Sequence, residues 1–223
     1  MTLIKFRENY PDHGPQITFT ELEAESRVYE RDEAGNDRYY APACSLVSHG
    51  IQNERWHCIC GGTSLLVYAW NAPFYRRPFD YASLEASLQN YLSLLIAFRR
   101  RDLTTLNLDE EPEIEQIFEA LTKALGTERA RAQVSAAKAL HVIAPSFFPM
   151  WDHSIAFDLY NCPYDQEPGI AYAAFCERIR TRIASLQDDW NALPPTHWLR
   201  QKANLKRVDE FNFMRRPPRR TQP

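Results

Sequence analysis

Glycine is scarce in this chain: 7 of its 223 residues are glycine, whereas 15 are proline. Scarce glycine argues against folds that are built on glycine-rich phosphate loops or on many tight hairpins. The motifs G-x-G-x-x-G, G-x-x-x-x-G-K-[ST], H-E-x-x-H and G-x-S-x-G are all missing, and so is an EF-hand loop. The sequence therefore gives no motif-level support for a dinucleotide enzyme, a P-loop NTPase, a zincin, an α/β-hydrolase or a calcium sensor.

Long hydrophobic runs are also missing. The longest apolar stretch, residues 64–70, is much shorter than the roughly 20 residues that a membrane-spanning helix needs. The first residues, MTLIKFRE, contain no apolar core of an export signal. The five cysteines are an odd number and are spread along the chain. We therefore expect a cytoplasmic protein with reduced thiols that makes no contact with a membrane.

The content of charged residues is typical of a globular protein, but the charges are unevenly distributed along the chain. Hydrophobic residues make up 44% of the chain and charged residues 25%, which is typical of a globular protein. The net charge is −3, yet residues 198–223 carry eight Lys or Arg against Asp209 and Glu210. The last ten residues, MRRPPRRTQP, contain no acid. We expect residues 206–223 to form a basic, disordered tail, which either solubilises the protein or contacts phosphates.

Apolar residues recur at helical spacing through the middle of the chain, which predicts a mainly α, bundle-like single domain over residues 61–205. Asp80 is expected to cap one helix, Pro112 to open the next, and Gly126 to end it in a left-handed conformation. We interpret residues 1–60 as an irregular segment, with a short helix after Thr20 and an extended stretch within residues 38–51. The predicted helices cover residues 63–71, 81–98, 111–125, 128–143 and 170–186, with another starting near Thr196.

Thiols and imidazoles cluster near the end of the N-terminal segment, and these are the groups that zinc prefers. The spacing is poor, because Cys58-Ile-Cys60 is a C-x-C and no second clean pair follows. We expect buried thiols and neither a metal nor another cofactor. A small helical structural protein with a zinc ion is the alternative. The residues concerned are Cys44, His49, His57, Cys58 and Cys60.

The most informative stretch is residues 134–155, VSAAKALHVIAPSFFPMWDHSI. Its small residues let a helix approach its neighbours closely, and an apolar turn from Pro145 to Trp151 then reverses the chain. Asp152 follows this turn, at the start of the next helix. A carboxylate in that place suits either a catalytic group beside apolar side chains or a plain helix cap.

This stretch resembles the core of the helix-hairpin-helix DNA glycosylases, the base-excision enzymes that include the 8-oxoguanine and mismatched-adenine glycosylases. The matching positions are Phe148, Pro149 and Asp152, after a leading helix at residues 134–143. The resemblance implies an 8-oxoguanine glycosylase-like fold and N-glycosidic cleavage of a DNA base, a hydrolase reaction. Asp152 would be the carboxylate that stabilises positive charge on the sugar or activates the nucleophile. Divergent, uncharacterised members share a longer pattern, here Ser135, Lys138, Leu140, His141, Pro145, Phe148, Pro149 and Asp152.

The sequence departs from the pattern of this family in two places. The phosphate-gripping hairpin L-P-G-[VI]-G is replaced by residues 128–135, and Gln133 stands where bifunctional members carry a catalytic lysine. Lys138, fourteen residues before Asp152, either faces the same cleft or forms a structural ion pair with Asp152. A glycosylase without lyase activity is therefore favoured. His141 is interpreted as a hydrogen-bonded core histidine rather than a base.

DNA is the expected partner. Arg129 and Arg131 occupy the hairpin position, and Arg76 and Arg77 follow a group of aromatic residues. Trp151 lies beside Asp152, and a flipped base is held by stacking on aromatic rings. The leading hypothesis is a DNA base-excision N-glycosylase-like protein. The alternative is a non-catalytic module that binds nucleic acid or protein on the same scaffold.

Overall fold

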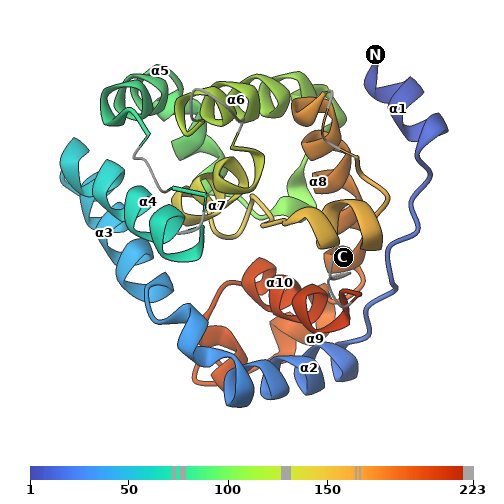
Figure 1. Cartoon of the computed structure of the whole chain (residues 1–223). Coiled ribbons are helices and arrows are strands. Elements are labelled where there is room, and N and C mark those ends of the chain that lie inside the picture. Colours follow the sequence, from blue (N-terminus) through green and yellow to red (C-terminus); the bar gives the residue numbers. More distant parts are fainter. Residues whose placement is uncertain (72–73, 76–78, 127–131, 164, 166, 218–223) are drawn as a thin grey trace, which may run out of the picture.

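The computed structural model describes residues 1–71, 74–75, 79–126, 132–163, 165 and 167–217, and every regular element in those ranges is a helix (Figure 1). The mainly α fold class is confirmed. The α-helices are α1 (Leu3–Asn9), α2 (Phe19–Asp32), α3 (Tyr40–Gln52), α4 (Trp56–Trp70), α5 (Tyr81–Arg99), α6 (Glu111–Ala124), α7 (Gln133–Ile143), α8 (Pro168–Ala184), α9 (Gln187–Ala192) and α10 (Asn204–Arg215). Short turns of helix are η1 (Ala34–Asp37), η2 (Leu103–Thr105), η3 (Leu108–Glu110), η4 (Ser154–Leu159) and η5 (Trp198–Gln201).

Local sequence explains where several helices begin. Asp80 caps α5 by accepting a hydrogen bond from the Ala82 amide, as predicted. Pro112 lies in the first turn of α6, where its missing N–H costs nothing. Thr18 and Glu21 form a capping box at the start of α2, which the sequence reading missed. The left-handed conformation of Gly126, which borders the undescribed residues 127–131, stays a prediction.

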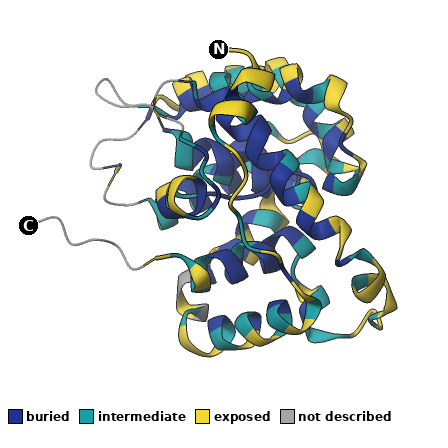
Figure 2. Cartoon of the chain, turned by 90° about the vertical axis from the view of Figure 1, so that its right-hand side faces the viewer, coloured by how far each residue is buried: buried dark blue, intermediate teal, exposed yellow. Residues whose placement is uncertain are grey.

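Helix α7 lies at the centre of the fold and packs against α3, α4 and α6 (Figure 1). Its small residues Ser135, Ala136, Ala137 and Ala139 are all buried, which allows these close approaches. The described helix starts at Gln133, and the predicted start at residue 128 falls among residues 127–131, which lie outside the described part of the chain. Buried residues gather on the inward faces of the helices and exposed ones on the outward faces (Figure 2).

The N-terminal 60 residues are mostly helical, so the prediction of an irregular segment is wrong there. An extended strap joins α1 to α2 along one side of the molecule (Figure 1). Two buried arginines of α8 hold this strap: Arg178 donates to the Tyr10 carbonyl, and Arg182 pairs with Asp12 and donates to the Gly14 carbonyl. The strap is therefore fixed by contacts with residues more than 160 positions away.

The predicted basic tail is also corrected. Residues 204–215 form α10, which packs against α2, and Lys206 and Arg207 are buried in it. Apolar side chains of α10, including Leu205, Val208 and Phe211, supply the buried face that a disordered tail lacks. Residues 218–223 lie outside the described part of the chain. Among the helices that are described, none is both long and apolar enough to cross a membrane.

Candidate functional site

A wide cleft of ≈ 1540 Å³ opens between α7 on one side and α2 and α10 on the other. The end of α4 and the turn before η4 complete its walls. Asp152 and Lys138, the two residues for which the sequence predicts chemistry, both line this cleft. The other lining residues with polar or aromatic side chains include Tyr29, Glu33, Arg38, Tyr39, Trp70, Asn71, Phe74, Gln133, Ser135, Trp151, His153, Asp158, Asp209, Phe213 and Arg216.

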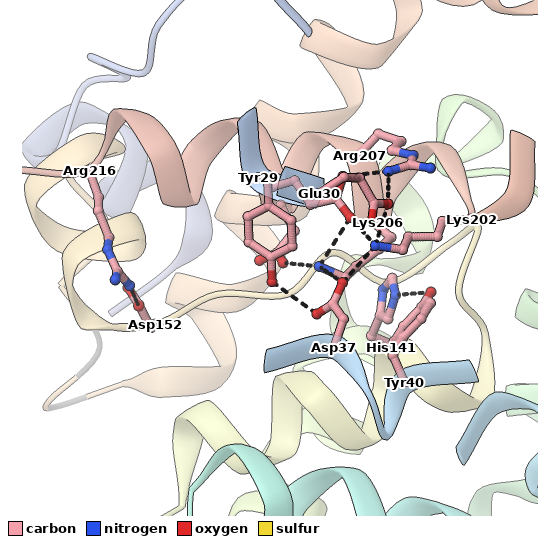
Figure 3. Close-up of polar contacts among 12 residues, drawn as sticks. Tyr29, Glu30, Asp37, Tyr40, His141, Asp152, Lys202, Lys206, Arg207 and Arg216 are labelled. Atoms are coloured by element: carbon pink, nitrogen blue, oxygen red, sulfur yellow. Dashed lines mark hydrogen bonds and ion pairs between the residues drawn. The ribbon is translucent and has the colours of Figure 1, made fainter. Parts of the chain in front are cut away.

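Asp152 uses one carboxylate oxygen as a helix cap and the other in an ion pair. Its Oδ1 accepts the amide of Ile155 at 2.8 Å, at the start of the π-helical turn η4. Its Oδ2 lies 3.1 Å from Nη1 of Arg216, which comes from the end of α10 (Figure 3). A carboxylate offers about four lone-pair sites, so these two contacts leave acceptor capacity toward the cleft. The capping interpretation is confirmed, and it does not exclude chemistry at the same group.

Lys138 is held against the end of α4. Its Nζ donates to Oδ1 of Asn71 at 2.8 Å and to the Trp70 carbonyl at 3.4 Å, and lies 5.5 Å from the centre of the Trp70 ring. Asn71 in turn donates to Oγ of Ser135 on α7. These bonds orient the ammonium group and tie α4 to α7 at the cleft wall. Arg216 forms an ion pair with Asp152, and a pair between Lys138 and Asp152 stays a prediction.

His141 is a core residue, as the sequence indicated. It is fully buried, and its Nδ1 donates to the Phe148 carbonyl at 2.8 Å. Its Nε2 is then the acceptor for the Tyr40 hydroxyl, 2.9 Å away (Figure 3). Burial lowers the pKa of His141 to about 4, so the ring is neutral at pH 7.

The predicted nucleic-acid contacts are only partly within the described structure. Trp151 is 1% exposed, and its ring packs against Phe118, Tyr172 and Phe175, while its Nε1 donates to the Gln133 carbonyl. This placement supports the cleft wall and leaves little ring surface for stacking on a base. The partly exposed Trp70 of α4 is the better-placed indole. Arg76, Arg77, Arg129 and Arg131 lie outside the described residues and stay predictions.

Sequence reasoning missed the contribution of α10 to the cleft. Asp209 and Phe213 are four residues apart on one face of α10, and Arg216 follows directly after the last turn of the helix. That spacing was visible in the sequence. The many Lys and Arg residues in positions 198–223 favoured the prediction of a disordered tail instead.

Asp209 belongs to a group of paired charges, the buried charge cluster, which we define as Glu30, Asp37, Lys202, Lys206, Arg207, Asp209 and Glu210. Figure 3 shows Glu30, Asp37, Lys202, Lys206 and Arg207 of this cluster. Lys206 is fully buried, and its Nζ lies 3.1 Å from Asp37, 3.2 Å from Asp209 and 3.5 Å from Glu210. The same Nζ lies 4.6 Å from the ring centre of Tyr29 and 5.4 Å from that of Trp70. The cluster thus joins α2, η1 and α10 behind the cleft wall.

The cysteines do not assemble a metal centre in the described part of the chain. All five are free thiols, and no group of three or more His, Cys, Asp or Glu side chains is placed to hold a metal ion there. Cys58 and Cys60 are two positions apart on α4, which turns their side chains about 200° away from each other. Two such thiols cannot bind one zinc ion from the same helix.

Comparison with known proteins finds no matching family model, and neither a curated protein nor a solved structure with significant similarity. The described part of the chain is an all-helical domain with a wide cleft.

Proposed function

We propose that this protein binds DNA, takes one nucleotide into the cleft and cleaves its N-glycosidic bond, with Asp152 as the carboxylate. The observation that carries the proposal is the meeting of Asp152 and Lys138 in one cleft, together with aromatic side chains. Trp70, Tyr39 and Phe74 supply rings on which an extruded base could stack. The resemblance of residues 134–155 to helix-hairpin-helix DNA glycosylases gives the reaction class.

The chemistry needs a negative charge close to the sugar. When the bond between C1′ and the base nitrogen breaks, positive charge develops on the sugar ring, and a fixed carboxylate stabilises it. Asp152 is fixed by the Ile155 amide and by Arg216, which orients its remaining lone pairs without a further ordering step. The same carboxylate can accept a proton from an attacking water molecule.

Lys138 is better suited to binding than to attack. Its Nζ is held by Asn71 and by the Trp70 carbonyl, so attack on a sugar would have to break both hydrogen bonds. Water is therefore the proposed nucleophile, and the enzyme has no lyase activity. Borohydride should trap no covalent adduct between the protein and a cleaved duplex. An adduct that is lost in Lys138→Gln would make Lys138 the nucleophile and contradict this assignment.

The test of the glycosylase proposal is release of damaged or mismatched bases by wild type, Asp152→Asn and a control. Asparagine caps a helix nearly as well as aspartate, so Asp152→Asn removes the charge while folding stability changes little. We expect it to slow base release by about 100-fold or more, the range for a lost acid–base group. Asp188→Asn is the matched control, because Asp188 is an exposed carboxylate of α9 that does not line the cleft. Equal rates for all three proteins would contradict a catalytic Asp152.

One observation favours a second candidate, a binding module without catalysis. Both oxygens of Asp152 already have partners, as in a purely structural cap. In that case wild type would bind duplex DNA and release no base. Asp152→Asn would then change stability by at most about 1 kcal/mol and leave binding unchanged.

A further inference from the structure

Asp209 is a second carboxylate on the cleft wall, in a setting unlike that of Asp152. It lies on α10 one turn before Phe213, and its side chain is 16% exposed. Its Oδ2 lies 3.2 Å from Nζ of Lys206, which is fully buried behind it. Within the described buried charge cluster, Asp209 is the one carboxylate that lines the cleft. It therefore connects the cluster to the space that a substrate would occupy.

Burial and two neighbouring carboxylates favour the protonated form of Asp209, against the opposing effect of Lys206. In the described cluster four carboxylates share three cations, so one negative charge is in excess. Lys206 and Glu210 face Asp209 from α10, and Asp37 faces it from η1; Tyr29 of α2 and Tyr40 of α3 also interact with its charge. Burial and the neighbouring carboxylates outweigh Lys206 and raise the pKa of Asp209 to about 6.

We propose that Asp209 donates the proton that a leaving base takes up when its N-glycosidic bond breaks in this cleft. The inference rests on the proposed glycosylase function and adds a second residue to it. Two carboxylates in unlike environments can divide acid and base roles between them. Asp152 would act as the charged group and Asp209 as the acid.

The step balances in atoms and electrons. The bond between C1′ and the base nitrogen breaks, its electron pair goes to the nitrogen, and the nitrogen takes the proton of Asp209. Water forms the new bond to C1′ and gives a proton to Asp152. Exchange with solvent then returns Asp209 to its protonated form and Asp152 to its charged form. The products are the free base and the sugar with a hydroxyl at C1′.

Other carboxylates of the region are less suited to this role. Glu210 is fully buried, and both of its oxygens are engaged, with Lys202 at 2.7 Å and Arg207 at 2.8 Å. Asp37 is bound by Tyr29, Lys202 and Lys206. Asp158 is exposed on the cleft rim, where water competes for any proton.

The experiment compares two kinds of leaving group. A neutral base such as 8-oxoguanine, mismatched adenine or uracil benefits from a proton when it leaves. N7-methylguanine already carries a positive charge and leaves as a neutral base without one. Single-turnover release from duplexes that contain each of these bases is measured for wild type, Asp209→Asn, Asp209→Glu and Asp188→Asn, with a thermal melt of every variant to confirm folding.

We expect Asp209→Asn to slow release of the neutral bases by about 100-fold, as for a lost general acid, and release of N7-methylguanine by less than about 3-fold. Asp209→Glu should recover part of the loss, and Asp188→Asn, at an exposed carboxylate that does not line the cleft, should match wild type. Wild-type release of the neutral bases should fall as pH rises above about 6. An equal effect of Asp209→Asn on both kinds of base would overturn the role of Asp209 as an acid and leave the proposed glycosylase function in place. No release of any base by wild type would overturn the proposed function together with it.

Discussion

At the residue scale, two buried titratable groups give the protein opposite responses to pH. Burial lowers the pKa of His141 to about 4 and helps to raise that of Asp209 to about 6. For His141 the unfolded chain binds more protons between pH 4 and 6.5, so its contribution to stability is lost as pH falls through that window. For Asp209 the folded chain binds more protons between about pH 4 and 6, so stability falls as pH rises through it.

Asp209→Asn should stabilise the protein at pH 8 and not at pH 4. The variant removes the excess negative charge of the buried charge cluster, and one pKa unit corresponds to about 1.4 kcal/mol. The gain at pH 8 should reach at most about 3 kcal/mol, because the pKa rises from 3.8 to about 6. Urea unfolding at the two pH values measures it. A variant that is less stable than wild type at pH 8 would show that the cluster needs the Asp209 charge.

His141→Gln should make the fold less sensitive to acid. Glutamine can donate to the Phe148 carbonyl and accept from the Tyr40 hydroxyl, and it does not titrate. Between pH 7 and pH 4.5 the variant should lose up to about 3 kcal/mol less stability than wild type. His57→Gln is the control, since His57 is exposed. If all three proteins lose stability equally, burial of a neutral His141 is not a source of acid sensitivity.

At the scale of elements, α10 shows a limit of predicting helices from local sequence patterns. The sequence alone predicts α5, α6 and α8 within a few residues, because their apolar faces, caps and first-turn prolines are local signals. It fails for α10, α1 and α3, whereas α2 agrees with the short helix predicted after Thr20. Their buried faces and charges are satisfied by distant partners: α2 packs on α10, and α1 on α8.

The candidate site likewise has residues that could be predicted from the sequence and residues that could not. Asp152 and Lys138 could be found from one short stretch, because that stretch forms one side of the cleft. Asp209 and Arg216 could not, because only the tertiary fold brings α10 opposite α7. A count of charges cannot separate a solvated basic tail from a helix whose cations are paired with Glu30 and Asp37.

The cations of α10 should differ sharply in their effect on stability. Lys206→Met leaves the carboxylates around it without their buried partner, and breaking a buried ion pair costs about 3–5 kcal/mol. Arg215 is 44% exposed and pairs with Glu25 on the surface. Arg215→Met should therefore cost less than about 1 kcal/mol. Urea unfolding of both variants at pH 7 tests this, and similar losses would contradict a structural role for the buried charge cluster.

At the scale of the whole molecule, the net charge does not favour binding to DNA. The net charge is −3, so binding has to come from local cations. Each phosphate that is neutralised contributes about −0.9 to the slope of log K against log salt. If Arg129 and Arg131 contact phosphates, replacing both with serine should flatten the slope by about 1.8. Arg55 and Arg100, which are exposed and do not line the cleft, are the matched control pair. An unchanged slope would remove Arg129 and Arg131 from the DNA interface.

The account depends most on the claim that the cleft receives an extruded nucleotide. Amide hydrogen exchange of the wild-type protein with a duplex that carries a tetrahydrofuran abasic analogue tests this directly. We predict slower exchange in residues 69–71, 133–138 and 150–158, which border the cleft, and a weaker effect with the intact duplex. Exchange that is unchanged in these segments, or slowed equally by both duplexes, would contradict the claim.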